Sequence, residues 1–491
     1  MLPYSWFLNL EQAHNRQNLR ASANMRKMGF LDDGVTAGNP DGLPVGFARD
    51  VNATRGDSLG LTCAACHTGQ IRYNDVDVRI DGGQSLGDLE RLQNAIHGSL
   101  DATLADAKKF ERFALLELGA SATDAEQDAL RARMVTVRDW WTGRIARSKG
   151  LTPHGPSRTD AFTIIGNEVT CALFQNPANC QPGVAPTQFP HLWDTPDFEW
   201  VQYNSSVHSP LGRNVGQVTG VFAEASFDAF GLSSTANLVN LHRLENWLKT
   251  LRSPAWPEDI LPPIDDTLVA RGEAVYAESC ASCHAEVAPR SAPNAFGVTF
   301  AQMNFSTPLQ LLGTDPTAAL KFATRRADPG PFRAVAEANG LVGIDGKAPV
   351  AALLSISGSM IIQRFFAVSG FDNLQKLDYL GFRQSRSPTT AQLTTYKARP
   401  LNGVAFTAPF LHNGSVPSIY ELLLPPAQRS TQFWVGSKEF DPAKLGYSTA
   451  WEDGAVLLDT TQVGNGNGGH LYGTSLSEAD RMAVLEYIKS L

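Results

Sequence analysis

The chain has 491 residues, which allows one large domain or two to three smaller ones with buried cores. Hydrophobic residues make up 43% and charged residues 18%, a balance typical of a folded chain rather than a disordered one. The net charge is −8 and no Lys- or Arg-rich run occurs, so nothing in the sequence supports nucleic-acid binding. No uninterrupted run of about 18 apolar residues occurs, so we predict no transmembrane segment. Six Cys in this length are too few for a small disulfide scaffold.

The first motif along the chain is Cys63-Ala64-Ala65-Cys66-His67, which matches C-x-x-C-H, the attachment signature of c-type haem. Two thiols three positions apart reach the vinyl groups on one porphyrin edge, and the next His then binds the iron. Cys63, Cys66 and His67 are therefore predicted to hold a haem. Thioether attachment implies export, so we expect a periplasmic or secreted protein. Residues 1–12 lack the basic and apolar regions of a signal peptide, so we expect that any signal was removed.

Cys171 and Cys180 lie in a loop rich in Pro, Asn and Gln. In an exported protein they are predicted to form a disulfide, the alternative being two unrelated buried thiols. Further along, residues 189–203 carry five aromatic residues. These are candidates to line an apolar pocket, and ordinary core packing is the competing interpretation for each of them.

A Pro-rich segment divides the chain into two units. Residues 253–265 contain four Pro that break any helix, so we predict an N-terminal haem domain at 1–252, a linker at 253–265 and a C-terminal haem domain at 266–491. Each unit ends in the same kind of helical sequence, which predicts a closing helix packed over the unit's first helix, as in a small cytochrome c. Both units are longer than a minimal cytochrome, so we expect large insertions that carry substrate-specific function.

The second motif, Cys280-Ala281-Ser282-Cys283-His284, repeats the signature. Cys280, Cys283 and His284 are predicted to hold a second haem, giving two covalently bound c-type haems. The alternatives are weaker, since a four-thiolate zinc site leaves both trailing His residues unexplained. A redox dithiol needs a strand–turn–helix setting that the sequence does not show.

His470 is the best candidate for the distal ligand of the second haem iron. It follows the Gly/Asn run 464–469 just before a predicted terminal helix, where cytochromes c commonly hold this ligand. An exposed loop His is the competing interpretation. Met303, Met360 and His412 are alternative ligands. We interpret Met360 as a core residue on an apolar helical stripe, and His412 as a group that bonds a haem propionate.

No distal ligand stands out for the first haem. His97 sits in a helical stretch, where a surface or packed His is more common, and His208 lies upstream of Arg213 and Asn214. The simplest interpretation is one six-coordinate haem that relays electrons and one open haem that does the chemistry. His67 is then the candidate catalytic residue.

Helical periodicity dominates the rest of the chain. We predict a mainly α fold with two cytochrome c-like haem domains and large loop and helix insertions. The predicted helices are 85–100, 124–144, 237–251, 266–278, 318–339, 349–366 and 476–491.

The chain resembles the bacterial di-haem cytochrome c peroxidase superfamily, and within it the branch of rubber oxygenase and the periplasmic di-haem fatty-acid dioxygenases. The landmarks are both haem motifs and residues 43–47, 80–83, 158–162 and 399–423. The resemblance implies that the N-terminal haem binds oxygen and that His470 is the distal ligand of the C-terminal haem. It also implies a calcium ion held by carbonyl oxygens near Thr407 and Pro409.

Two departures from the peroxidases favour an oxygenase. Residues 415–430 contain no Met, and no His follows His67 until His97. The first hypothesis is therefore an O2-dependent dioxygenase acting on an unsaturated apolar substrate, a fatty acid or a polyisoprenoid. The second is a peroxidase that reduces hydrogen peroxide with electrons from a donor cytochrome and needs a polar distal group. The third is a pure electron carrier with two closed haems.

Overall fold

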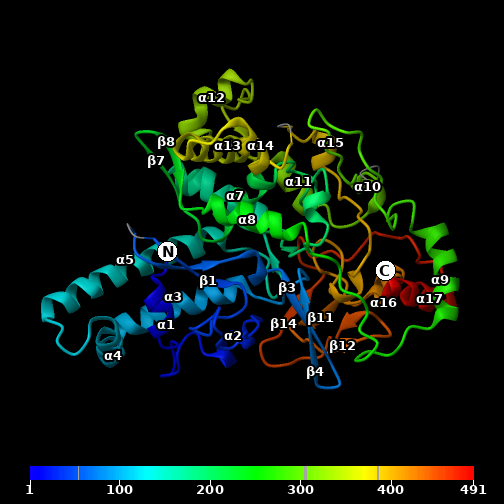
Figure 1. The fold of residues 1–491 in the computed structure, drawn as a ribbon, viewed down its shortest axis with the longest axis horizontal. Helices are drawn as coiled ribbons and strands as arrows, with labels where there is room; N and C mark the ends of the chain where they lie inside the picture. Colours follow the sequence, from blue (N-terminus) through cyan, green and yellow to red (C-terminus); the bar gives the residue numbers. More distant parts are fainter. Residues whose placement is uncertain (53–54, 303–306, 384–385) are drawn as a thin grey trace.

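A computed structural model describes residues 1–491 apart from 53–54, 303–306 and 384–385. Met303, one of the alternative ligands, lies outside the described residues. The described chain forms seventeen α-helices and seven two-stranded antiparallel ladders (Figure 1). Helices dominate this architecture, which confirms the predicted mainly α class. The division into two haem domains stays a prediction.

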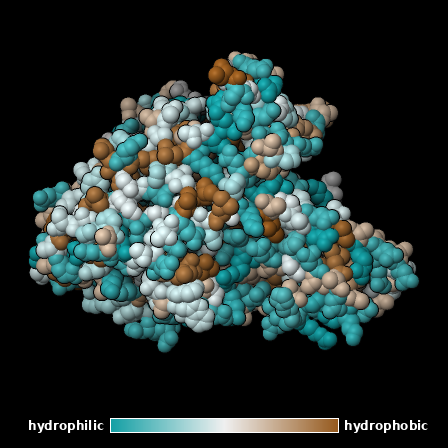
Figure 2. All heavy atoms as spheres, turned by 180° about the vertical axis from the view of Figure 1, so that it is seen from behind, coloured by the Kyte–Doolittle hydropathy of each residue, from teal (hydrophilic) through white to brown (hydrophobic). Residues whose placement is uncertain are grey.

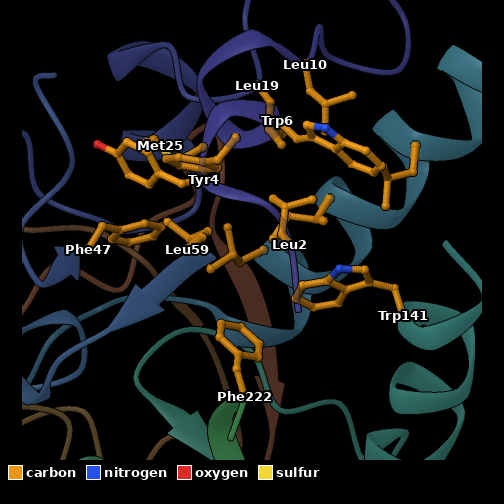
Figure 3. Packing of buried hydrophobic residues seen from close by; sticks show 14 of the residues in the cluster. Leu2, Tyr4, Trp6, Leu10, Leu19, Met25, Phe47, Leu59, Trp141 and Phe222 are labelled. Atoms are coloured by element: carbon orange, nitrogen blue, oxygen red, sulfur yellow. The ribbon is translucent and has the colours of Figure 1, made fainter. Parts of the chain in front are cut away.

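The N-terminal core is built by four helices: α1 (Tyr4–Asn9), α3 (Leu89–Ala105), α4 (Ala107–Leu118) and α5 (Asp124–Ser148). The Asp88 side chain accepts a hydrogen bond from the Arg91 amide, so α3 begins four residues later than predicted. The large side chains of Trp6 and Trp141 are buried in this cluster (Figure 3).

Two β-hairpins flank the first Cys motif. Strands β1 (Phe47–Asp50) and β2 (Ser58–Leu61) precede it, and β3 (Thr68–Tyr73) and β4 (Val76–Asp81) follow it. Cys63–Ala65 form a single 3₁₀ turn between them. Among the described residues no helix leads into Cys63, so this unit lacks the predicted first helix. The closing helix of this unit, α8 (Leu238–Leu248), packs on α7 (Pro210–Val221) instead.

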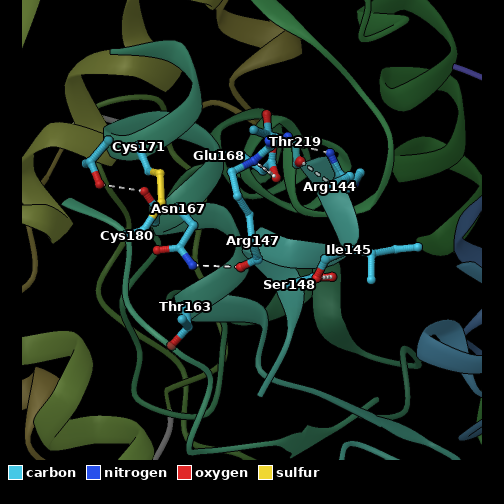
Figure 4. A network of polar contacts seen from close by, with 12 residues as sticks. Arg144, Ile145, Arg147, Ser148, Thr163, Asn167, Glu168, Cys171, Cys180 and Thr219 are labelled. Atoms are coloured by element: carbon cyan, nitrogen blue, oxygen red, sulfur yellow. Dashed lines mark hydrogen bonds and ion pairs between the residues drawn. A yellow bond between two sulfur atoms is a disulfide. The ribbon is translucent and has the colours of Figure 1, made fainter. Parts of the chain in front are cut away.

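An insertion follows α5 and is held by polar side chains and a disulfide. α6 (Ala161–Asn167) continues into a π-helical turn at Glu168–Leu173, and Cys171 is bonded to Cys180, as predicted. Glu168 pairs with both Arg144 and Arg147, at 3.5 and 2.9 Å (Figure 4). These contacts join the insertion to the long helix α5.

The predicted helix at 318–339 is wrong as a single element. The structure has α11 (Thr317–Thr324), the short strand β9 (Arg326–Ala327), a 3₁₀ turn at Gly330–Phe332 and α12 (Arg333–Ala338). Pro329 and Pro331 interrupt the backbone hydrogen bonds that a continuous helix would need.

The C-terminal unit does contain the predicted helix pair. α9 (Asp266–Ser279) leads into the second Cys motif, and the terminal helix α17 (Glu478–Ser490) packs directly on it. A Cβ at Gly272 would lie 2.0 Å from the Ala483 carbonyl oxygen, so the absence of a side chain permits this close crossing.

Both predicted units contribute to one hydrophobic core. Ile71 and Trp193 pack in the same buried cluster as Phe406 and Val484. Trp256, from the predicted linker, is 8% exposed and stacks on Phe406. The Pro-rich segment is therefore packed against the protein rather than extended between two bodies.

Helix α13 (Val350–Ser369) is long and apolar enough to cross a membrane by length and composition alone. Its buried side includes Leu353, Ile361 and Phe366, which pack in a third core cluster with α7 and α8 residues. On the side of the molecule drawn in Figure 2, apolar residues lie in separate groups among hydrophilic ones.

The remaining elements are short connections around these cores. The helices are α2 (Ser22–Lys27), α10 (Leu309–Leu312), α14 (Asn373–Tyr379), α15 (Thr390–Leu393) and α16 (Ile419–Leu422). The paired strands are β5 (Arg158–Thr159) with β6 (Thr187–Gln188), β7 (Ala225–Asp228) with β8 (Gly231–Ser234), β9 with β10 (Ala348–Pro349), β11 (Gln432–Val435) with β14 (Val456–Asp459), and β12 (Phe440–Asp441) with β13 (Gly446–Tyr447).

Candidate functional site

The second Cys motif follows the C-terminal end of α9. Cys280 caps that helix, and the chain then turns so that His284 points inward. The Nδ1 atom of His284 lies 2.8 Å from the carbonyl oxygen of Arg399. A carbonyl can only accept, so Nδ1 donates and Nε2 keeps the lone pair that a metal needs.

His470 is presented by a tightly fixed loop before α17. Its backbone amide donates to the Leu312 carbonyl at 2.8 Å, and its own carbonyl accepts from Arg429 at 3.2 Å. Gly469 has a φ of +71°, and a Cβ there would lie 2.1 Å from the Gly313 carbonyl carbon. Only Gly fits that position, so the sequence of the loop determines where the His470 ring lies.

The imidazoles of His284 and His470 face each other with ring centroids 6.2 Å apart. This separation suits two imidazoles that bind one metal ion from opposite sides, because each metal–nitrogen bond takes about 2 Å and each ring adds its own radius. Burial lowers the pKa of His470 to about 4, and it also lowers the pKa of His284. Both rings are therefore kept in the neutral form that ligates metals.

The two alternative ligands lie in other surroundings. The His412 ring stacks on Tyr396 with centroids 4.0 Å apart, and no ring contact with His284 occurs among the described residues. His412 nevertheless lines the same cavity, so its predicted bond to a haem propionate stays a prediction. Met360 packs against the core cluster around α13, in agreement with its interpretation as a core residue.

The first Cys motif positions its His in the same way as the second. The Nδ1 atom of His67 lies 2.6 Å from the carbonyl oxygen of Pro190, which again leaves Nε2 available. Burial lowers the pKa of His67 to about 4, so this ring is also neutral. Among the described residues, the ring contact of His67 is with Phe189 rather than with a second imidazole.

One cavity joins the two motifs. It holds about 2020 Å³ of space, including the part open to solvent, and it is bordered by His67, Cys280, Cys283, His284 and His470. Most of its wall is apolar and comes from Leu192, Phe198, Val201, Val404, Phe410 and Leu423. A single apolar cavity that reaches both C-x-x-C-H motifs suits two flat, largely hydrophobic groups bound near each other.

Two cations face this cavity without a hydrogen-bonded carboxylate among the described residues. Lys397 lies 3.5 Å from the Trp200 carbonyl oxygen, and Arg399 donates to two backbone carbonyls. Burial holds the pKa of Lys397 well below its usual range and lowers that of Arg399 to about 10. Buried cations are costly unless an anion pairs with them. The carboxylates of haem propionates are such anions, so these residues fit the group that the Cys motifs imply.

The segment of the chain that contains Lys397 and Arg399 matches a known family. Residues 395–435 match the family described as RoxA-like, cytochrome c-like. The chain is also 32% identical over 551 residues to the uncharacterized protein y4iJ of Sinorhizobium fredii, an alignment that covers 100% of this chain and 89% of the relative. The chain belongs to the y4iJ family. The uncharacterized protein y4iM of the same organism is 26% identical over 301 residues, which covers 60% of this chain and 57% of that relative.

The RoxA-like segment supports a haem cytochrome oxidoreductase with covalently bound c-type haem for this member of the y4iJ family. The segment begins at Thr395, so it includes Lys397 and Arg399 as well as the run after them. The matched segment contains neither Cys motif, so the individual ligands are assigned from the geometry of the site.

The aromatic segment 189–203 of the y4iJ-family chain is divided between two roles. Phe198 and Tyr203 line the cavity, as predicted. Trp193 stacks on His191 with centroids 4.3 Å apart, and Trp200 packs edge-on against His208. These two Trp side chains serve the packing of the cavity wall.

Thr407 and Pro409, the predicted calcium residues, take part in contacts within the protein. The Thr407 hydroxyl donates to the Val404 carbonyl at 2.9 Å, and the Pro409 carbonyl accepts from the Gln188 side chain. Among the described residues, no group of three or more His, Cys, Asp and Glu is placed to hold a metal ion. The calcium ion stays a prediction.

Sequence reasoning missed Lys397, Arg399 and His191 in the y4iJ-family chain. Each lines the cavity, and His191 is a buried imidazole whose Nε2 has no hydrogen-bond partner among the described residues. The spacing of Lys397 and Arg399, two charges just before an apolar run, was the available signal. His97 lies apart from the site, where it bonds Thr142 at 2.8 Å.

Proposed function

We propose that the chain is a di-haem c-type cytochrome that acts as an O2-dependent dioxygenase on an unsaturated apolar substrate. The observation that carries the proposal is the asymmetry between the two Cys motifs. All three histidines border the cavity, but His284 faces a second imidazole, that of His470, whereas the ring contact of His67 among the described residues is with Phe189. A c-type haem held by His67 would supply the binding and activation of O2 there.

The residues of the chain would divide the work as follows. His67 and His284 hold the two irons with their Nε2 atoms, because backbone carbonyls fix the opposite ring nitrogens. His470 closes the second site and leaves it to relay electrons. The apolar wall, including Phe198 and Val201, excludes water and offers a surface for an alkene-containing chain such as a fatty acid or a polyisoprenoid.

We further propose that the protein works in the periplasm or outside the cell. The Cys171–Cys180 disulfide supports this location, since disulfides persist in oxidising compartments. Thioether attachment of haem also takes place after export.

A peroxidase is the second candidate, and the pair formed by Arg213 and Glu245 is the observation in its favour. Arg213 lines the cavity, and Glu245 Oε2 is buried without a hydrogen-bond partner among the described residues. A buried carboxyl paired with an arginine of the cavity wall is the kind of group that moves a peroxide proton.

Oxygen uptake by the purified protein, with no added reductant, tests the proposal. We expect uptake and oxygenated cleavage products with an unsaturated fatty acid or polyisoprene, and none with the saturated fatty acid of equal length. Turnover that requires hydrogen peroxide and a reduced donor cytochrome would favour the peroxidase. Two haems that both fail to bind carbon monoxide would identify a pure electron carrier.

A further inference from the structure

The two proximal histidines are joined by a short chain of hydrogen bonds. His67 Nδ1 donates to the Pro190 carbonyl at 2.6 Å, and the backbone carbonyl of the next residue, His191, accepts from Arg399 Nη1 at 3.2 Å. The backbone carbonyl of the same Arg399 accepts from His284 at 2.8 Å. The imidazole of the first motif is therefore connected to that of the second. The connection consists of three hydrogen bonds, the backbone from Pro190 to His191, and Arg399.

Arg399 and its neighbours also hold the segment 190–193 in place. Its Nη2 donates to the Trp193 carbonyl at 2.7 Å, so the planar guanidinium binds the carbonyls of both His191 and Trp193. Trp193 Nε1 in turn donates to the Asn402 carbonyl at 2.9 Å. The segment that orients His67 is thus anchored on the segment that orients His284, although about 200 positions separate them in sequence.

We propose that Arg399 is a positioning residue that couples the two haem sites. It orients His284 through its backbone carbonyl and His67 through the clamped segment 190–193, and it provides the electron path between them. The inference rests on the proposed di-haem function but not on its substrate. With both haems bound, one electron would pass from the group held by His284, which would be oxidised, to the group held by His67, which would be reduced. No bond breaks, and both Nδ1 protons stay where they are.

The test compares Arg399→Lys and Arg399→Gln with a matched control, Arg383→Gln. Arg383 is a buried arginine, and its hydrogen bonds among the described residues also go only to backbone carbonyls, those of Pro196, Phe198, Glu199 and His208. None of these carbonyls accepts from a proximal His. The control therefore removes a buried cation near the cavity and leaves the path intact.

The readout is the rate at which the electron re-equilibrates between the two haems, in either direction along the same path, after flash photolysis of carbon monoxide from the half-reduced protein. We expect both Arg399 variants to slow it about tenfold or more, the usual size of effect for contacts that surround a metal ligand, because the guanidinium no longer holds the carbonyls of His191 and Trp193. Arg383→Gln should leave the rate unchanged. Potentiometric titration distinguishes the effect of the arginine's charge from the effect of its hydrogen bonds. The Lys variant keeps the charge and thus the reduction potentials, while the Gln variant lowers both potentials.

Wild-type rates in the Lys variant would overturn the proposal, as would equal slowing in Arg383→Gln. If neither Arg399 variant folds, the wild-type protein still decides, because absent electron transfer between its haems would leave the path without a role. A chain that matures with no covalent haem would overturn the proposed function as well. A chain with two haems and no oxygenase activity would leave the coupling intact and refute only the dioxygenase.

Discussion

The ring of His470 lies opposite the ring of His284, with 6.2 Å between the two centroids, across the cavity that both Cys motifs border. The two residues come from distant parts of the chain. His284 follows α9, and His470 precedes α17, so the packing of these two helices sets the distance between the two rings.

Replacing His470 should open the second site. In His470→Gly we expect the low-spin electron paramagnetic resonance signal of a bis-His haem to disappear, and carbon monoxide to bind two haems per chain instead of one. His412→Phe is the matched control, since His412 stacks on Tyr396 and should leave the stoichiometry at one. If carbon monoxide binds two haems per chain in the His412 variant alone, the distal ligand is His412.

The close crossing of α9 and α17 predicts a strong effect of one methyl group. In Gly272→Ala the new Cβ would collide with the Ala483 carbonyl oxygen, so the free energy of unfolding should fall by about 1–3 kcal/mol. Gly216→Ala in α7 is the control, because nothing lies within 4 Å of its Cβ. Ala there should stabilise the protein by about 0.5–1 kcal/mol. Chemical denaturation of both variants checks this, and equal effects would contradict the crossing.

The ion pairs of Glu168 anchor the disulfide-containing insertion to α5 (Figure 4). The Arg144 side chain is only 1% exposed, so Glu168→Gln leaves a buried cation without its charge partner. We expect the free energy of unfolding to fall by about 3–5 kcal/mol. Asp139→Asn removes a partner from a surface pair and should cost at most about 1 kcal/mol. Equal decreases in the free energy of unfolding of the two variants would contradict a larger contribution from the buried ion pairs.

Acid should destabilise the chain partly through His412. Burial lowers the pKa of His412 from 6.5 to about 4 in the folded protein. Between these values the unfolded chain binds a proton that the folded chain excludes, so stability falls as the pH drops from 6.5 towards 4. In His412→Phe we expect the slope of stability against pH to decrease by up to one proton in this window. Denaturant titrations at several pH values measure it, and an unchanged slope would contradict the burial of a neutral ring.

The haem ligands could be predicted from sequence because spacing alone identifies C-x-x-C-H and because His470 stands beside a distinctive Gly/Asn run. The role of Arg399 could not, since it depends on contacts with residues about 200 positions away, which no local pattern encodes. The hairpin after His67 was predictable in principle. Asn74 and Asp75, with φ of +48° and +64°, form a turn of the kind that short polar residues favour. The helix predicted at 318–339 failed because helical periodicity continued across two Pro.

The depth of the Cys residues implies an order of events during maturation. Burial raises the pKa of Cys66 to about 12, which disfavours the reactive thiolate in the folded chain. Burial also raises the pKa of the neighbouring Cys63, and both side chains are half-buried. If these thiols carry a haem, its covalent attachment is favoured while the first hairpins are still open. Haem attachment and folding would then compete with each other. A chain that folds before its haem is attached would stay inactive.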